Sequence, residues 1–123
     1  MNGLNIEEFM NLPYGKRFSY TISRIKENQT IWSFKRKSGK FSMNIGINDI
    51  PELLVWSDEN FAYYNLTKEW SNEKVVSISV EEFEKELYPK LLAGNYNILV
   101  ATMEYKRGKV ISAQNFLNLI RKD

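Results

Sequence analysis

Four glutamates lie close together between residues 81 and 86, and paired carboxylates are side chains that could perform acid/base chemistry or bind a hard metal ion. On a helix, Glu82 and Glu86 share one face because residues four apart are neighbours. Lys85 and Lys90 stand among them, and neither an aspartate-rich loop nor a glycine turn accompanies them. The pattern therefore favours a solvated helix face, and we predict no catalytic residue and no metal site. The four residues are Glu81, Glu82, Glu84 and Glu86.

The residue types that are missing exclude several classes of enzyme. The sequence has no histidine, which rules out a serine-histidine-aspartate triad, a histidine base and a zinc site built on imidazole. It has no cysteine, so thiol nucleophiles and disulfides are excluded as well. Its 6 glycines are isolated and form no phosphate-binding loop or dinucleotide fingerprint. We therefore expect a protein that is not an enzyme and has no cofactor.

Two short basic segments could contact phosphate groups or an acidic partner. Aromatic rings beside their cations could also stack on unpaired bases. The net charge is only +2, but residues 1–48 carry +5, residues 49–104 carry −7 and residues 105–123 carry +4. Charged turns are usually solvated, so nucleic-acid binding is the alternative and not the favoured interpretation. The basic residues are Lys35, Arg36, Lys37 and Lys40, then Lys106, Arg107 and Lys109, with Phe34, Phe41 and Tyr105 as aromatic neighbours.

Aromatic residues are frequent between residues 56 and 70. On a helical wheel Phe61 and Tyr64 lie nearly opposite Trp70, although a helix that buries one stripe should not carry aromatic side chains on both sides. Two interpretations stay open. Phe61 and Tyr64 pack under the hairpin or a neighbouring loop, which we favour, or Tyr64 and Trp56 form a surface for a protein partner or a flat ligand, as residue types enriched at interface hot spots do. The candidate partner surface consists of Trp56, Phe61, Tyr64 and Trp70.

The stretch from 52 to 101 has the pattern strand, helix, strand, helix, strand. The apolar run 53–56 has strand length, and Ser57 followed by two acids is typical of a helix start. Alternation over 75–80 predicts the second strand, after which Ser79 and Glu82 have capping-box spacing. The next helix should end at Gly94 in the left-handed conformation, and Pro89 inside it predicts a kink or a break. Residues 98–101 then read as a buried strand.

The flanking segments complete the predicted order of elements. A short helix should end before Pro13, and residues 14–25 fit a helix or a strand, of which we prefer the helix. Alternation over 30–35 and 41–47, with Ser38 and Gly39 between them, predicts a β-hairpin. A strand at 110–111 precedes a last helix that Ser112 caps. We expect an α+β or α/β fold, with a mixed sheet of about five to six strands and helices packed on it.

The length of 123 residues and the hydrophobic content of 43% suit a single domain over residues 1–123. No run approaches the roughly 20 apolar residues that a membrane span requires. The first residues lack the basic and apolar parts of a signal peptide, and the absence of cysteine is compatible with a reducing compartment. We expect a cytoplasmic protein that does not bind membranes.

Five segments are distinctive in their order along the chain. They are Arg17 to Ile25 running into Ile31-Trp32, LLVWSDENFAYYN at 53–65, SISVEEFEKELYPKL at 77–91, ILVATM at 98–103 and VISAQNFLNLI at 110–120. Together, over residues 14–120, they resemble the small bacterial family called domain of unknown function 2750 (DUF2750). Since that family has no established activity, the resemblance implies a fold and not a function.

These observations lead us to expect a non-enzymatic protein-interaction or regulatory module, with an immunity protein as one type. It would use the aromatic surface around Trp56 and Tyr64, and its partner would be another protein or a second copy of the chain. The alternative is a nucleic-acid-binding protein that uses the two basic segments.

Overall fold

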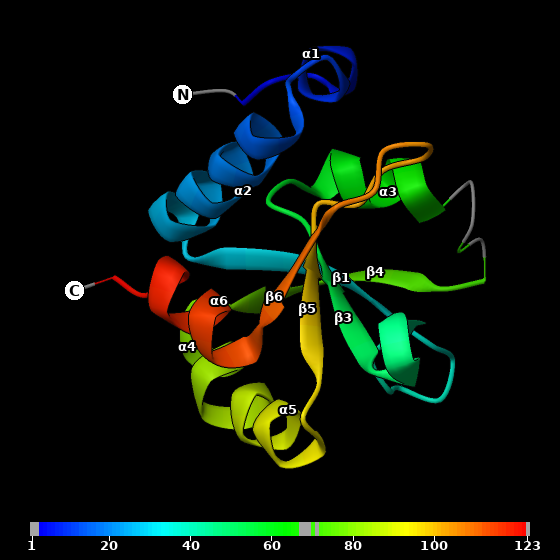
Figure 1. Cartoon of the computed structure of the whole chain (residues 1–123), viewed down its shortest axis with the longest axis vertical. Coiled ribbons are helices and arrows are strands. Elements are labelled where there is room, and N and C mark those ends of the chain that lie inside the picture. The colour runs from blue at the N-terminus through cyan, green and yellow to red at the C-terminus, as the bar shows by residue number, and fades with distance from the viewer. Residues whose placement is uncertain (1–2, 67–69, 71, 123) are drawn as a thin grey trace.

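The computed structural model describes residues 3–66, 70 and 72–122, and it confirms the α+β fold (Figure 1). The strands are β1 (Thr30–Lys35), β2 (Met43–Ile45), β3 (Pro51–Val55), β4 (Lys74–Ser79), β5 (Asn97–Val100) and β6 (Lys109–Ser112). The helices are α1 (Ile6–Met10), α2 (Tyr14–Asn28), α3 (Glu59–Leu66), α4 (Val80–Glu82), α5 (Tyr88–Gly94) and α6 (Ala113–Ile120), with a 3₁₀ turn (Ile47–Asp49) and a π turn (Phe83–Leu87). The sequence predicted this third helix over residues 58–70, but Trp70 is not helical, and residues 67–69 lie outside the described residues.

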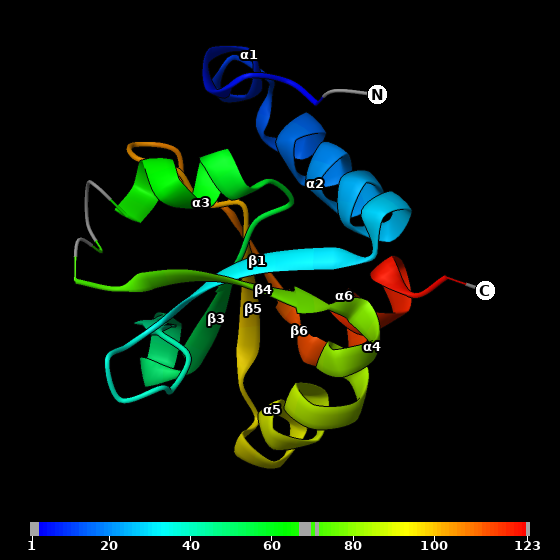
Figure 2. The same ribbon diagram turned by 180° about the vertical axis from the view of Figure 1, so that it is seen from behind.

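The six described strands form two sheets. One has the order β2-β3-β5-β6, in which β3 and β5 are parallel and both edge strands are antiparallel to their neighbours. The other is the antiparallel ribbon β1-β4, which runs across the first sheet (Figure 2). A backbone bridge between Trp32 and Trp56 joins the two. The parallel strands are buried on both faces, which explains the continuous apolar runs at 53–55 and 98–100.

The predicted hairpin over 30–47 is wrong in its pairing. β1 and β2 meet only beside the turn, where Lys35 bridges Phe41 and the amide of Ser42 donates to the carbonyl of Phe34. On its other edge β1 pairs along its whole length with β4, and β2 pairs with β3. Ile31 and Phe34 point to opposite faces of β1, and both are fully buried. Both faces of β1 therefore need packing partners, and an isolated hairpin does not provide them.

Residues 14–25 lie in α2, so the helical interpretation is confirmed. The helical interpretation predicted a buried stripe of Tyr14, Phe18, Ile22 and Ile25. Ile22 and Ile25 are buried as predicted, Tyr14 is exposed, and the buried stripe also includes Arg17 and Thr21. Arg17 is tolerated in this stripe because its guanidinium donates to the carbonyl oxygen of Leu12 at 2.7 Å. Among the described residues, neither α2 nor any other helix has the length and apolar composition needed to cross a membrane.

The helical segment after β4 is distorted just before Pro89, where a kink or a break was predicted, but it stays helical throughout. Ser79 caps its start by accepting a hydrogen bond from the amide of Glu82 at 3.0 Å. The segment then widens into the π turn and resumes as α5, because proline lacks an amide hydrogen and its ring displaces the carbonyl four residues earlier. The left-handed residue at the end of α5 is Asn95, with φ 57°, and not Gly94 as predicted. Asparagine tolerates this conformation better than other side chains do.

The helices gather at the two ends of the molecule, with α1, α2 and α3 toward one end and α4, α5 and α6 toward the other (Figure 1). Phe9 of α1 stacks on Phe61 of α3 with ring centroids 4.5 Å apart. The start of α3 is held by a largely buried ion pair in which Arg24 Nη2 lies 2.7 Å from Asp58 Oδ2. The hydrogen bond from Arg24 to Asp58 raises the pKa of Arg24. Ring stacking and this ion pair therefore fix α3 against α1 and α2.

Replacing Gly108 by alanine should destabilise the fold. Gly108 is buried just before β6, and a Cβ there would lie 2.6 Å from the amide nitrogen of Thr102 and closer still to the carbonyl oxygen of Val100. Both are backbone atoms, so neighbouring chain segments must move apart, and we expect urea titrations to show a loss of about 1–3 kcal/mol in the free energy of unfolding.

The matched control is Gly15→Ala in α2, where a Cβ would meet nothing within 4 Å. Alanine stabilises a helix more than glycine does, so the free energy of unfolding of this variant should rise by about 0.5–1 kcal/mol. Equal stability of the two variants would contradict the close approach described for Gly108.

Candidate functional site

A groove of about 650 Å³ lies between the turn that joins β1 to β2 and the helical segment from α4 to α5. Cations outnumber acids around it, and we call it the basic groove. Arg36, Lys40 and Lys90 are exposed there, and the ammonium group of Lys35 lies 4.9 Å from the ring centroid of Phe41. Glu82 and Glu86 are the acids in the lining. The local surplus of positive charge favours an anionic ligand.

The basic groove also has an apolar wall. Leu87 and Glu86, which lie in the π turn, both line the groove, and π turns occur frequently at functional sites. The distortion before Pro89 therefore lies beside the groove. A ligand with both apolar and anionic groups fits this lining better than a purely charged one. The apolar side chains are Phe41, Met43, Ile78, Leu87 and Leu91, of which Ile78 and Leu91 are buried and the others half-buried.

A second, smaller hollow of about 300 Å³ lies on one face of the four-stranded sheet, beside the loop between β5 and β6, and we call it the turn pocket. Leu54 and Leu99, which pair across β3 and β5 and are both buried, form its base. Thr102 follows the end of β5, so the turn pocket lies toward the carboxyl ends of the parallel strands, where ligands commonly bind in α/β sheets. The remaining lining residues are Asn44, Trp70, Met103, Tyr105, Lys106 and Arg107.

A buried carboxylate borders the turn pocket. The side chain of Glu52 is 3% exposed. Its Oε1 accepts a hydrogen bond from the side-chain Nδ2 of Asn44 at 2.8 Å and lies 3.6 Å from Arg107 Nη2. Gly46 provides the room for Oε2, because a Cβ at that position would overlap it. An unpaired buried charge is costly, so the carboxylate of Glu52 needs both contacts. The contact with Arg107 holds this loop residue over the sheet.

Two residues of the predicted partner surface belong to the core. Trp56 and Phe61 have no exposed surface. Trp56 bridges to Trp32 between the two sheets, and Phe61 is stacked on Phe9. The expectation that these two residues contact a partner is therefore corrected. Phe61 is a core residue, as the favoured interpretation had it, but its ring stacks on Phe9 of a helix, α1, and not on a loop.

Tyr64 and Trp70 are half-buried and do not join an aromatic surface with the other two. The hydroxyl of Tyr64 lies 3.4 Å from Oε2 of Glu104 in the loop after β5. Trp70 lines the turn pocket and approaches Phe34 with ring centroids 6.3 Å apart. On α3 the aromatic side chain that points outward is Tyr63. The four predicted residues therefore do not form one aromatic surface.

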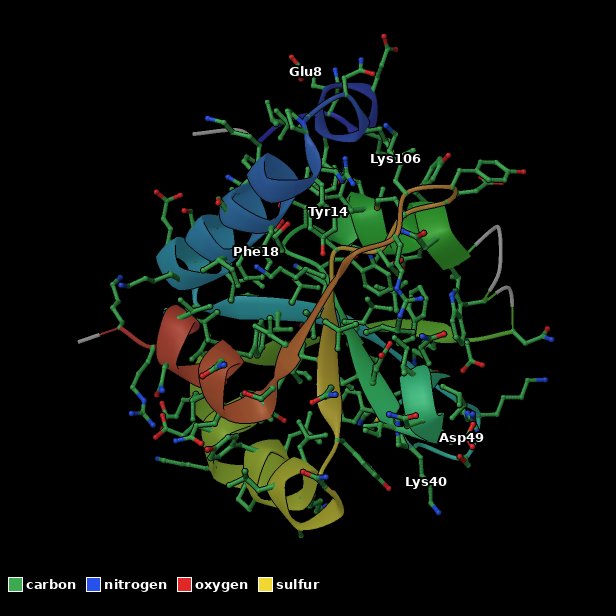
Figure 3. All side chains as sticks on the ribbon, viewed as in Figure 1. Glu8, Tyr14, Phe18, Lys40, Asp49 and Lys106 are labelled. Carbon is green, nitrogen blue, oxygen red and sulfur yellow. The ribbon has the colours of Figure 1, made fainter. Side chains whose placement is uncertain are left out.

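The two basic segments serve different hollows. Lys35, Arg36 and Lys40 border the basic groove, while Lys106 and Arg107 border the turn pocket. Figure 3 shows Lys40 and Lys106 toward opposite ends of the molecule. The two described segments therefore do not combine into one basic face, which the nucleic-acid alternative would use.

The last two basic candidates line neither hollow. Lys37 is exposed at the tip of the turn between β1 and β2. The ammonium group of Lys109 lies 4.7 Å from the ring centroid of Phe18 in α2, and Figure 3 shows Phe18 on that helix. Lys109 is thus engaged in a cation–π contact within the fold.

The glutamates at 81–86 are divided between ion pairs and the basic groove. Glu81 accepts from Lys85 at 2.7 Å, and this hydrogen bond lowers the pKa of Glu81. Glu84 pairs with Arg121 at 2.9 Å, and the other two line the basic groove. Within the described residues, no three side chains of the metal-binding types lie together as a metal-ion site.

Sequence reasoning did not identify Lys90, Leu87 or Tyr96 as site residues. Glu86 and Lys90 are four residues apart, a spacing that usually indicates an ion pair along a helix. Only the turn between β1 and β2, which is distant in sequence, makes these residues the wall of a groove. Tyr105 was noted as an aromatic neighbour of cations, but its exposure could not be predicted.

A comparison with protein families gives one match to this chain. A family model described as protein of unknown function (DUF2750) matches residues 18–120, which include all lining residues of both hollows. A comparison with curated proteins finds no match.

The core position of Trp56 predicts a stability effect. The indole Nε1 of Trp56 donates to the carbonyl oxygen of Thr102 at 2.8 Å. Trp56→Phe leaves that acceptor unpaired and opens a cavity, so the free energy of unfolding should fall by about 1–3 kcal/mol in urea titrations. Trp32→Phe, at a half-buried side chain on the partner strand, should cost less than half as much. Equal losses at both positions would argue against a central role for the Trp56 ring.

Proposed function

The chain belongs to the DUF2750 family, whose description assigns no activity, and we propose that it is a non-enzymatic protein-interaction module. In this proposal the basic groove holds an acidic and partly apolar segment of a partner protein. The proposal replaces the aromatic surface expected from the sequence with a site whose charged residues are exposed.

The charge of the basic groove is the observation that carries this proposal. Arg36, Lys40 and Lys90 are exposed around a hollow whose acids are Glu82 and Glu86, so cations exceed acids even before Lys35 is counted. Complementary charge steers partners together and suppresses binding of like-charged ones. An acidic segment is therefore the partner chemistry that fits.

The apolar wall supports a protein segment over a free inorganic anion. Burial of apolar side chains against Phe41, Met43 and Leu87 would contribute affinity that a small ion cannot gain. The volume of about 650 Å³ lies within the range of ligand sites, so a short segment with one or two apolar anchors suits it.

A role without catalysis is part of the proposal. The chain has no histidine and no cysteine, and the chemistry lining the groove is that of lysine, arginine and glutamate. A bacterial, cytoplasmic and regulatory or immunity-type role completes it, supported by the resemblance to a bacterial family and by the absence of cysteine.

Peptide selection on the wild-type chain tests the proposal. Selected peptides should be rich in aspartate and glutamate with interspersed apolar residues, and Arg36→Ala/Lys40→Ala should weaken their binding at least tenfold, equivalent to about 1.4 kcal/mol. The matched control is Lys16→Ala/Lys26→Ala, which removes two exposed cations of α2 and should leave affinity nearly unchanged. Isothermal titration calorimetry provides the affinities.

Three outcomes would contradict the proposal. Equal losses in the two double variants would mean that net charge and not the groove attracts the peptides. Selection of peptides without acidic residues would remove the partner chemistry. Tight binding of an oligothymidylate probe that weakens steeply with salt would support the nucleic-acid alternative instead. A wild-type dimer that dissociates in Arg36→Ala/Lys40→Ala would identify a second copy as the protein partner, within the proposal.

A further inference from the structure

The turn between β5 and β6 holds a tyrosine in a backbone conformation that tyrosine disfavours. Met103 and Lys106 form a bridge in which each amide donates to the other's carbonyl at 2.9 Å. Tyr105, the third residue of this four-residue turn, has φ 62°. Glycine or asparagine is the usual residue at a turn position with positive φ, because a Cβ there crowds the backbone.

Packing does not compensate for this strain. The Tyr105 side chain is 96% exposed, so burial of its ring contributes almost nothing to folding. The turn is nevertheless well held, since Glu104 meets the hydroxyl of Tyr64 at 3.4 Å and Arg107 reaches the buried Glu52. A strained residue whose side chain packs on nothing is expected at a functional position and not at a structural one.

The surroundings of Tyr105 indicate what it would bind. Tyr105, Lys106 and Arg107 are consecutive lining residues of the turn pocket, and Trp70 lines it as well. Aromatic rings provide stacking faces for planar groups, and the two cations attract negative charge. Asn44 and Thr102 add polar groups that can orient a ligand.

We propose that the turn pocket binds a small planar organic anion, with Tyr105 stacking on its ring and Lys106 and Arg107 contacting its anionic group. The volume of about 300 Å³ lies at the lower limit for ligand sites, so one ring system with one charged group fits. A nucleoside monophosphate and an aromatic carboxylic acid share this chemistry. The site is separate from the basic groove, so the proposal stands independently of the protein-interaction function.

The test uses the full chain and four probes: adenosine monophosphate, indole-3-carboxylate, adenosine and inorganic phosphate. Titration calorimetry gives the affinities. Either ringed anion should bind at least tenfold more tightly than adenosine or phosphate, and the tighter of the two identifies the source of the ligand. If neither ringed anion binds, or if phosphate alone binds equally well, the proposal is overturned.

Tyr105→Gly and Tyr105→Asn separate binding from folding. Both residues accept the positive φ, so the unfolding midpoint should stay unchanged or rise, while affinity for the ringed anion falls at least tenfold. Tyr63→Ala, at an exposed tyrosine of α3 outside the turn pocket, should keep full affinity. Retained affinity in both Tyr105 variants, or a lowered unfolding midpoint, would overturn the role of Tyr105.

The cations have a matched pair of variants as well. Lys106→Gln should weaken binding of the ringed anion severalfold and reduce its salt dependence, whereas Lys37→Gln, at the other turn, should change neither. Equal effects of the two variants would show that only the overall charge matters and would overturn the assigned contact.

Discussion

The contacts of Trp56 connect the two sheets to each other and to the loop after β5. Its backbone exchanges two hydrogen bonds of 2.9 Å with Trp32, which tie the β1-β4 ribbon to the four-stranded sheet. Its indole donates to Thr102 after β5, and its ring lies 4.7 Å from that of Phe34. One fully buried side chain thus connects both sheets and the loop that carries Tyr105.

The basic groove exists because β1 and β2 part after their turn. In a regular hairpin β1 and β2 would pair with each other, and the cations of the turn would only face solvent. Here β1 pairs with β4 and β2 with β3, so the turn with Arg36 and Lys40 stands across from the helical segment with Leu87 and Lys90. The segment itself is shaped by Pro89, since the π turn before it carries Leu87. Two local features distant in sequence form one site.

The aromatic residues are divided sharply between core and surface. Trp56 and Phe61 are fully buried, whereas Tyr105 is almost fully exposed on a strained turn. Burial of the first two stabilises the fold, because each ring removes a large apolar area from water. Tyr105 contributes no such burial, and its conformation costs free energy. Because of this contrast, we assign a structural role to Trp56 and Phe61, and ligand binding to the turn that holds Tyr105.

The local features of this protein follow from short stretches of its sequence. Ser79 and Ser112 cap the helices that follow them, Pro89 distorts its helix, and apolar runs and alternation predicted the strands and the α+β class. These features depend on contacts within a few residues, which is what periodicity and capping report. Only the tertiary structure decided which strands pair, which side of α3 is buried and which cations share a hollow. Such choices depend on hydrogen bonds and packing between segments far apart in the chain, and no local pattern records them.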